Sequence, residues 1–448
     1  MKFLRVKVKS SNDLANPGSE TSGRIETIIL FKSIIWLLLI LISINHAFLS
    51  ITPITMNRCK SRIKFELKLS YEAYDLLRSF NNLGSLLGAI IFTLIIEKIN
   101  HKHTLISFLL INCICHFSFY LKLPFLVLLI SRFISGLVTS YCTIYFPFWV
   151  DKFGINNWIG FMQALVQISK IFGVSIGYSL FSILGNRKWN YFFLIESILV
   201  TIVTFLMYLI PSDYYDKRYI DMERENKIDI NIDEKVEKET VIKDIFFNIP
   251  FLLLQFYRGK IIFINQTNRY YYSNQLDSAI FGNEKNFVFH SYLFNTVLSS
   301  FLGIITGSLI LIMIGGQNSK HSFLCLFYLQ LLSCFLGFLS NKYDSTVFFN
   351  IMICLFNYFN SACGIISINV SFALMAKSLK GISCGILNII HNLIGILPAF
   401  KGYKLIKNYV GEKGIINVLM LYGLIGCIEL MVADIYIKFN KVKLGQKY

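Results

Sequence analysis

Amide and charged side chains recur at helical spacing inside long apolar runs of this sequence. Gln163, Gln167 and Lys170 stand at i, i+4 and i+7, which places them on one face of one helix. If such a run crosses a bilayer, a charged side chain near its middle costs from about 2.5 to more than 10 kcal/mol, depending on the method. We therefore expect this face to line a water-filled path. The alternative is that the glutamines join neighbouring helices and Lys170 extends to the membrane interface.

Arg132 lies well inside another apolar run. Its planar guanidinium group matches the geometry of a carboxylate or a phosphate. We expect Arg132 to bind a solute or to take part in coupling. The alternative is a buried ion pair with an acid such as Glu196.

Three more runs carry polar residues that we expect to face the same path. In one of them Gln255 and Arg258 share a helix face, with Lys260 nearby, unless that span is shorter than its apolar run. The full set predicted to line the path is Arg132, Gln163, Gln167, Lys170, Gln255, Arg258, Asn357, Asn388, His391 and Asn392.

Two histidines within apolar runs are candidates for proton coupling. His391 lies between Asn388 and Asn392, and His46 follows Asn45. A histidine titrates near neutral pH, so either side chain is suited to couple solute movement to a co-transported proton. The alternative for each is a hydrogen-bonding role in helix packing.

Basic residues outnumber acids on these faces: Arg132, Lys170, Arg258 and Lys260 are present without a definite carboxylate among them. In a medium of low dielectric, positive charge attracts anions strongly. We therefore expect a small anionic or zwitterionic solute.

Composition defines the class of protein that holds these residues. Of 448 residues, 55% are apolar and only 15% are charged, which is more apolar surface than a soluble chain of this length buries. A helix needs about 20 mostly apolar residues to cross a bilayer. We expect an all-α membrane protein with twelve spans, near residues 29–51, 74–97, 104–122, 124–150, 157–184, 189–211, 245–266, 286–314, 320–340, 346–376, 381–400 and 414–437.

The spans fall into two six-helix halves joined by a charged linker. The expected order is an N-terminal segment 1–28, a first half 29–211, a linker 212–244, a second half 245–437 and a tail 438–448. Glycines recur at offsets of about 220 residues between the halves, as expected of a duplicated unit. The recurring pairs are Gly88 with Gly307, Gly136 with Gly364, and Gly173 with Gly395.

Lysine and arginine in the loops predict the orientation of the chain. They are more frequent on the side that holds the N-terminus, the linker and the tail, so we expect both termini to be cytoplasmic. The net charge of +17 does not indicate a nucleic-acid-binding protein, because the basic residues flank apolar spans. The bilayer is the expected partner of these charges.

Three segments resemble the major facilitator superfamily. The stretch TLIIEKINHKHTL, from Thr93 to Leu105, is similar to the loop signature of that family, with Thr93 and Asn100 where the family has glycine. Arg132 and Gly136 match its Arg-x-x-x-Gly pattern, and with GVSIGYSL after position 172 they look most like the spinster-type branch, which carries lysophospholipids, sphingolipids or other organic anions.

This resemblance implies two six-helix halves and secondary active transport by alternating access. It implies a gating role for Glu97, and we group Lys98, Lys102 and Asp151 with it as gate residues. The alternative is that Glu97, Lys98 and Lys102 only anchor a helix end at the headgroups. Glu196 and Glu429 fall in spans that are peripheral in that fold, so we expect both to be structural.

Two other classes of function remain open. A non-transporting sensor or scaffold would explain the missing glycines, and a polytopic lipid-modifying enzyme would require a reactive cluster, which the sequence does not present convincingly. We expect neither enzymatic activity nor a cofactor or metal. The expected partners are a small-molecule substrate, the bilayer and a proton.

Overall fold

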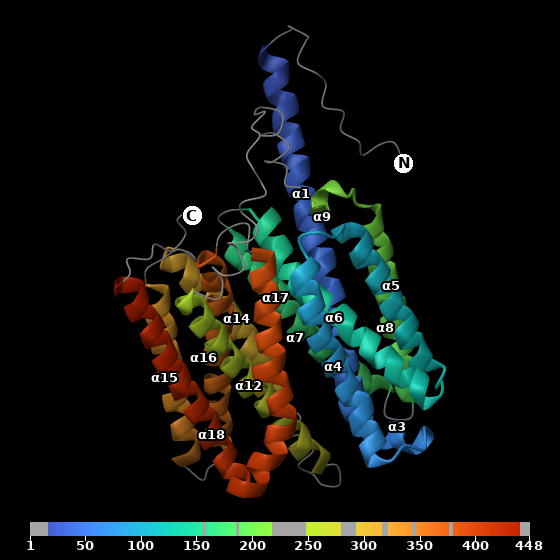
Figure 1. Ribbon diagram of the computed structural model, residues 1–448, viewed down its shortest axis with the longest axis vertical. Coiled ribbons are helices and arrows are strands. Elements are labelled where there is room, and N and C mark those ends of the chain that lie inside the picture. Colours follow the sequence, from blue (N-terminus) through green and yellow to red (C-terminus); the bar gives the residue numbers. More distant parts are fainter. Residues whose placement is uncertain are drawn as a thin grey trace.

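The computed structural model describes residues 17–155, 158–184, 188–216, 248–278, 293–315, 321–342, 346–375 and 380–439, and all regular structure within these ranges is helical. The helices form two bundles side by side, blue to green and yellow to red in Figure 1. Eight helices of the described part are long and apolar enough to cross a membrane. The chain is therefore a multi-pass integral membrane protein.

The first bundle contains six long helices and three short ones. The long helices are α1 (Pro17–Leu49), α4 (Tyr71–Ile95), α5 (His101–Tyr120), α6 (Phe125–Phe153), α7 (Ile159–Leu184) and α8 (Trp189–Leu209). The short helices are α2 (Thr52–Arg58), α3 (Lys60–Glu66) and α9 (Asp213–Asp216).

The second bundle, in its described part, contains six α-helices and two π-helical turns. Its elements are α12 (Ile249–Ser278), η4 (Leu293–Leu298), α14 (Ser299–Met313), α15 (Ser322–Lys342), α16 (Thr346–Ala373), α17 (Lys380–Ile390), η6 (His391–Ile396) and α18 (Leu397–Phe439). We call the end of the molecule where α1 begins and α18 ends the terminal face, and the other end the distal face (Figure 1).

Several helix limits differ from those expected. The helix that holds the seventh expected span, α12, continues to Ser278, beyond its apolar run. α1 begins at Pro17 rather than near residue 29. The distal connection after α1 contains α2 and α3, where no helix was predicted. The charged linker expected at 212–244 lies outside the described residues, except for its first five, which include α9.

Asn100 explains how the loop after α4 does without the glycine expected there. Its side chain accepts a hydrogen bond from the His103 backbone N–H at 3.2 Å and caps the first turn of α5. Its φ of −76° lies in the ordinary range, so no glycine is required.

Close helix crossings at glycine recur in both halves. A Cβ atom on Gly84 of α4 would lie 2.1 Å from the Phe133 carbonyl oxygen of α6. A Cβ on Gly303 of α14 would lie 2.2 Å from the Tyr358 carbonyl oxygen of α16. The pair α4 and α6 therefore corresponds to the pair α14 and α16, as a duplicated unit requires.

Of the glycine pairs noted in the sequence, Gly173 and Gly395 also occupy equivalent crossings. Gly173 packs on Ala47 of α1, and Gly395 packs on Ile262 of α12. Gly364 does not repeat the role of Gly136. Gly136 lies against the Asn81 carbonyl oxygen, whereas the nearest atom to a Cβ on Gly364 would be 3.9 Å away.

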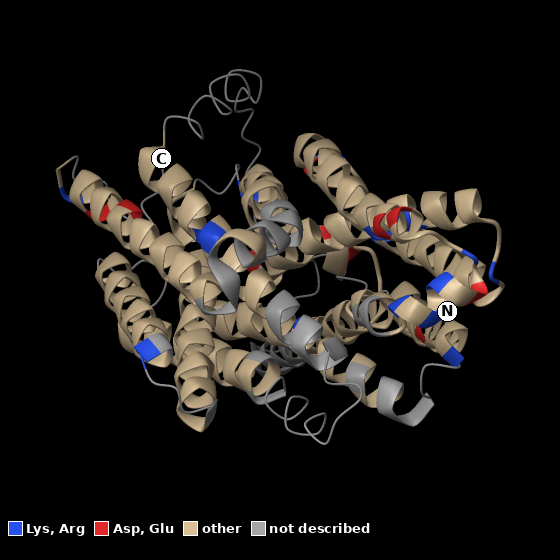
Figure 2. Ribbon diagram, turned by 90° about the horizontal axis from the view of Figure 1, so that it is seen from below, with Lys and Arg blue, Asp and Glu red and all other residues tan. Residues whose placement is uncertain are grey.

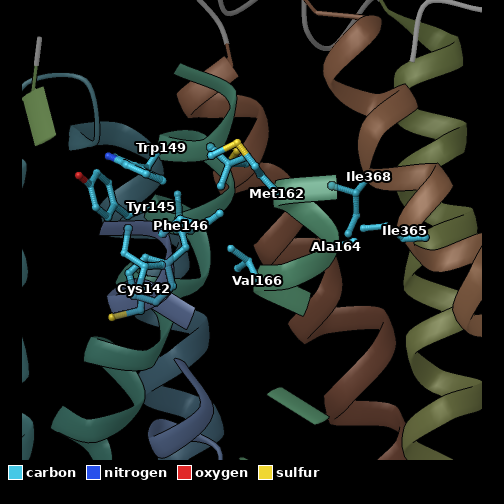
Figure 3. Close-up of a cluster of buried hydrophobic side chains, with 14 of the residues drawn as sticks. Cys142, Tyr145, Phe146, Trp149, Met162, Ala164, Val166, Ile365 and Ile368 are labelled. Carbon is cyan, nitrogen blue, oxygen red and sulfur yellow. The ribbon is translucent and has the colours of Figure 1, made fainter. Parts of the chain in front are cut away.

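An apolar core continues from one half into the other. Figure 3 shows the buried side chains of α7 between those of α6 and those of α16, where Ile365 and Ile368 lie. Large hydrophobic side chains such as Leu94, Ile114 and Phe205 are exposed on the outer surface. Most of the coloured ribbon in Figure 2 carries no charged residue. A surface of this kind is stable in lipid, where backbone groups must be bonded within each helix.

Candidate functional site

The asparagines of the eleventh span join the two halves. Asn388 Nδ2 of α17 donates a hydrogen bond to Ser140 Oγ of α6 at 2.9 Å. Ser85 Oγ of α4 donates to Asn392 Oδ1 of η6 at 3.3 Å. Both asparagines are at most 2% exposed. Asn388 and Asn392 therefore lie at the boundary between the halves.

Positively charged residues from both halves act on His391. Lys170 of α7 and Arg258 of α12 both interact electrostatically with His391, the first residue of η6. His391 Nδ1 is buried and has no hydrogen-bond partner within the described part of the chain. We call Lys170, Arg258 and His391 the central basic cluster. A π-helical turn at this point is typical of functional sites, because it rotates the following side chains out of the α-helical register.

Lys170 and Arg258 are the two members of the central basic cluster that carry a permanent charge. Of these two, Arg258 is the more deeply buried. Its side chain lies among α12, α17 and η6 and is 9% exposed. Its Nη1 atom is buried without a hydrogen-bond partner among the described residues. A buried guanidinium with a free donor is suited to bind an anionic group.

His46 lies next to this cluster, in the first half. Its Nδ1 atom is 3.1 Å from the Val166 carbonyl oxygen and 3.4 Å from Ser169 Oγ, both in α7. The bond to the carbonyl requires a proton on Nδ1. Lys170 interacts electrostatically with His46 as well as with His391.

Three of the other predicted residues bond within their own half. Gln163 Nε2 donates to the Pro147 carbonyl oxygen at 2.8 Å, and Gln255 Nε2 donates to Ser371 Oγ at 2.9 Å. Asn357 Nδ2 donates to the Asn295 carbonyl oxygen at 2.8 Å. The Gln163 contact joins α7 to α6, as in the helix-joining alternative for Gln163 and Gln167. Gln167, one turn from Gln163, is half-buried.

Arg132 lies inside the first half. It is 3% exposed, and its electrostatic neighbours include Tyr74 of α4 and Glu196 of α8. Its Nε atom is buried without a hydrogen-bond partner among the described residues. The proximity to Glu196 corresponds to the structural alternative for Arg132.

Lys260 has an acidic partner in its own half. Its Nζ lies 2.5 Å from Glu429 Oε1 of α18. Arg132 therefore lies near Glu196 and Lys260 is paired with Glu429, each within its own half, whereas Lys170 and Arg258 both act on His391 at the boundary between the halves.

Two of the four predicted gate residues contact the other half. Asp151, near the end of α6, forms an ion pair with Lys380 at the start of α17, with 2.7 Å between Oδ1 and Nζ. Glu97 lies against Gly381, since a Cβ there would be 3.2 Å from Glu97 Oε1. Sequence reasoning missed Lys380, whose only signal was its position at a helix start.

The other two predicted gate residues are Lys102 and Lys98. Lys102 Nζ donates to the Ile210 carbonyl oxygen at 2.5 Å, at the end of α8 in the same half. Lys98 is exposed on the terminal face. Lys102 therefore holds a helix end of its own half.

Thr93, which stands where the family signature has glycine, packs on a glycine of the second half. A Cβ on Gly385 of α17 would lie 2.0 Å from Thr93 Oγ1 of α4. The close approach between these helices is therefore kept, with the small residue on the opposite helix.

A separate groove of about 780 Å³ lies between α15 and α18, away from this site. It is almost wholly apolar and open on one side, as expected of a surface that faces lipid chains. Its lining includes Tyr328, Phe335, Phe338 and Met420.

The family model of the major facilitator superfamily matches residues 28–399. The chain therefore belongs to the major facilitator superfamily, a family of membrane transporters. A search of curated protein sequences finds no match.

Several solved structures share the fold at low sequence identity. The proton:xylose symporter XylE bound to 6-bromo-6-deoxy-D-glucose has a TM-score of 0.67 at 13% identity, covering 91% of this chain and 96% of the other. The E. coli fucose:proton symporter FucP has a TM-score of 0.58 at 14% identity, covering 90% and 98%. The human organic anion transporter MFSD10 has a TM-score of 0.59 at 12% identity, covering 88% and 97%. These similarities support two six-helix halves.

Proposed function

We propose that this protein is a secondary active transporter that moves a small anionic or zwitterionic solute, an organic anion or a lysolipid-like molecule, by alternating access. The observation that carries the proposal is the central basic cluster, in which Lys170 and Arg258 approach His391 from opposite halves. A solute that binds both bases holds the halves together, and its release lets them separate.

The contacts at the terminal face support alternating access. The Asp151–Lys380 ion pair and the Thr93–Gly385 packing close the bundle at that face. A transporter of this type must break these contacts when it opens there. The excess of Lys and Arg near this face favours its placement in the cytoplasm, with both termini.

A proton is the coupling ion that we favour. His391 and His46 both lie beside Lys170, so a change of charge on either histidine alters the field at the solute site. Two of the similar structures are named as proton symporters. The Arg132 and Gly136 pattern keeps the spinster-type branch as our choice within the family.

Solute uptake by proteoliposomes tests the proposal. The panel contains radiolabelled organic anions, zwitterions including a lysophospholipid, and cations. We expect saturable uptake of an anion or zwitterion, lowered at least about tenfold by Lys170→Ala or Arg258→Ala, because each removes about 1.4 kcal/mol or more of attraction. Lys122→Ala, which removes a base of the distal face, is the matched control.

Other outcomes distinguish the alternatives. Uptake of a cation that is insensitive to Lys170→Ala and Arg258→Ala contradicts the assigned solute charge. A folded protein that moves no member of the panel supports the sensor or scaffold alternative. Turnover of a lipid in detergent, where no gradient exists, supports the enzyme alternative.

A further inference from the structure

A second buried polar cluster lies within the first half, separate from the central basic cluster. It consists of Thr52 of α2, His116 of α5 and Glu196 of α8. Among the described residues, Glu196 is the sole Asp or Glu that is fully buried, at 1% exposed, and His116 is 2% exposed. A buried carboxylate needs either a close cation or a proton.

The hydrogen bonds fix where protons are in this cluster. Thr52 Oγ1 donates to Glu196 Oε2 at 2.6 Å, so the hydroxyl proton is committed to the carboxylate. Thr52 Oγ1 is then free only to accept from His116 Nε2, 3.4 Å away, so we assign the imidazole proton to Nε2. In a neutral imidazole Nδ1 is consequently a bare acceptor.

That bare acceptor faces a second acceptor. His116 Nδ1 lies 3.5 Å from Glu196 Oε1. Both atoms are buried, and neither has a hydrogen-bond partner within the described part of the chain. Two lone pairs that face each other in a dry site repel, and one proton between them satisfies both.

The charges around the pair come from the helices packed on it. Arg132 of α6 acts on both Glu196 and His116, and Cys113 of α5 lies near Glu196. On α1, Asn45 bonds to Met207 of α8. Arg132 compensates Glu196 when the carboxylate is charged and is released from it when the carboxylate is neutral.

We propose that Glu196 and His116 form a binding site for a single exchangeable proton inside the first half. A hydronium ion transfers its proton to Glu196 Oε1 and becomes water, and the resulting carboxyl O–H donates to His116 Nδ1. No other bond forms or breaks, and the site gains one unit of positive charge.

The site is placed to act on the boundary between the halves. Thr52 is the first residue of α2, which packs on α7, and α7 packs on α14 of the second half. Protonation of Glu196 weakens the hydrogen bond that it accepts from Thr52, because a neutral carboxyl group is a weaker acceptor than a carboxylate. The use of this site in transport rests on the proposed function, but proton binding itself does not.

Infrared difference spectroscopy of the full-length protein in lipid nanodiscs, recorded through a pH titration, detects this proton directly. We expect the carbonyl stretching band of a buried carboxylic acid to appear as the pH falls. Glu196→Gln should abolish that band. Glu429→Gln, which changes another carboxyl group in a membrane-spanning helix, should leave it in place.

His116→Phe provides a second readout if Glu196→Gln does not fold. The carboxylic acid loses its acceptor in this variant, so its carbonyl band should move to higher wavenumber. A wild-type spectrum without a carboxylic acid band overturns the proposal. So does a band that survives Glu196→Gln, or one that does not move in His116→Phe. None of these results depends on solute uptake, so failure of the proton site is distinct from failure of the transport proposal.

Discussion

Lys380 Nζ, at the start of α17, lies 2.7 Å from Asp151 Oδ1, near the end of α6, and this ion pair connects the two halves at the terminal face. The two side chains are 14% and 9% exposed. An ion pair shielded to this degree is stronger than one on an open surface. It therefore favours the conformation that is closed at this face.

Loss of the Asp151–Lys380 ion pair should open the terminal face. We expect Asp151→Asn or Lys380→Gln to lower the population closed there about tenfold, equivalent to about 1.4 kcal/mol, because an unpaired charge remains in each case. Distances between spin labels placed on the two halves measure this shift.

The exchange Asp151→Lys with Lys380→Asp should restore the closed population. Asp434→Asn, which breaks the Asp434–Lys438 pair within α18, is the control and should change nothing. Unaltered distances in both single variants would show that the pair does not hold the halves together.

The packing of Gly385 on Thr93 predicts a rescue experiment. Gly385→Ala places a Cβ 2.0 Å from Thr93 Oγ1, so the halves cannot close fully and the closed state loses about 1–3 kcal/mol. Thr93→Gly in the same chain should recover most of that loss. Spin-label distances across the terminal face measure both variants.

Gly364→Ala is the matched control for this rescue, since the nearest atom to its added Cβ is 3.9 Å away. Equal effects of Gly385→Ala and Gly364→Ala would indicate a general loss of helix flexibility instead of a clash with Thr93.

The Lys260–Glu429 ion pair should contribute to the stability of the folded protein, because breaking it leaves one charge unpaired. Lys260→Met leaves Glu429 without its partner and should lower the free energy of unfolding by about 3 kcal/mol. Adding Glu429→Leu should restore much of it, because an apolar pair suits this environment. Denaturation in detergent, followed by tryptophan fluorescence, measures both. A double variant as unstable as the single one would refute this interpretation.

Glu66, on the distal face, should give the protein a pH dependence. Burial alone would raise the pKa of Glu66, but hydrogen bonds from Lys122, Trp189 and Arg62 outweigh it and hold this pKa below its ordinary value. The stabilisation is fully present above the unfolded pKa of about 4.3 and is lost as the pH falls through the lower folded pKa.

We therefore expect the melting temperature to decrease below about pH 4.3, and Glu66→Gln to reduce this decrease. The expected loss at neutral pH is about 1 kcal/mol, because Lys122 and Arg62 are each 41% exposed. Glu72→Gln, at an exposed position in the first turn of α4, is the control. Identical acid profiles for wild type and Glu66→Gln would contradict this assignment.

The sequence predicted the helices well because apolar length and glycine spacing are local properties. It predicted the partners of polar residues less well. Arg132, Lys170, Arg258 and Lys260 look alike in sequence, but only Lys170 and Arg258 approach His391 at the boundary between the halves. Which helix face meets which neighbour depends on packing across the whole bundle.

The contacts of the predicted gate residues were equally hard to predict from the sequence. The signature indicates a gating role for Glu97, and Asp151 is grouped with it, yet the residues that they contact lie at the start of α17, more than two hundred residues away in the chain. Thr93 packs on Gly385 of α17, so the helices lie close together there although Thr93 stands where the signature has glycine.

Reversible cross-linking of the terminal face tests the central claim most directly. Asp151→Cys and Lys380→Cys, combined in one chain and joined by a short cleavable bifunctional thiol reagent, fix the two halves in contact. Single-cysteine variants given the same treatment control for reaction at the ten native cysteines. We predict that uptake of the transported anion or zwitterion into proteoliposomes stops on cross-linking and returns on cleavage. Undiminished uptake by fully cross-linked protein would contradict transport by alternating access.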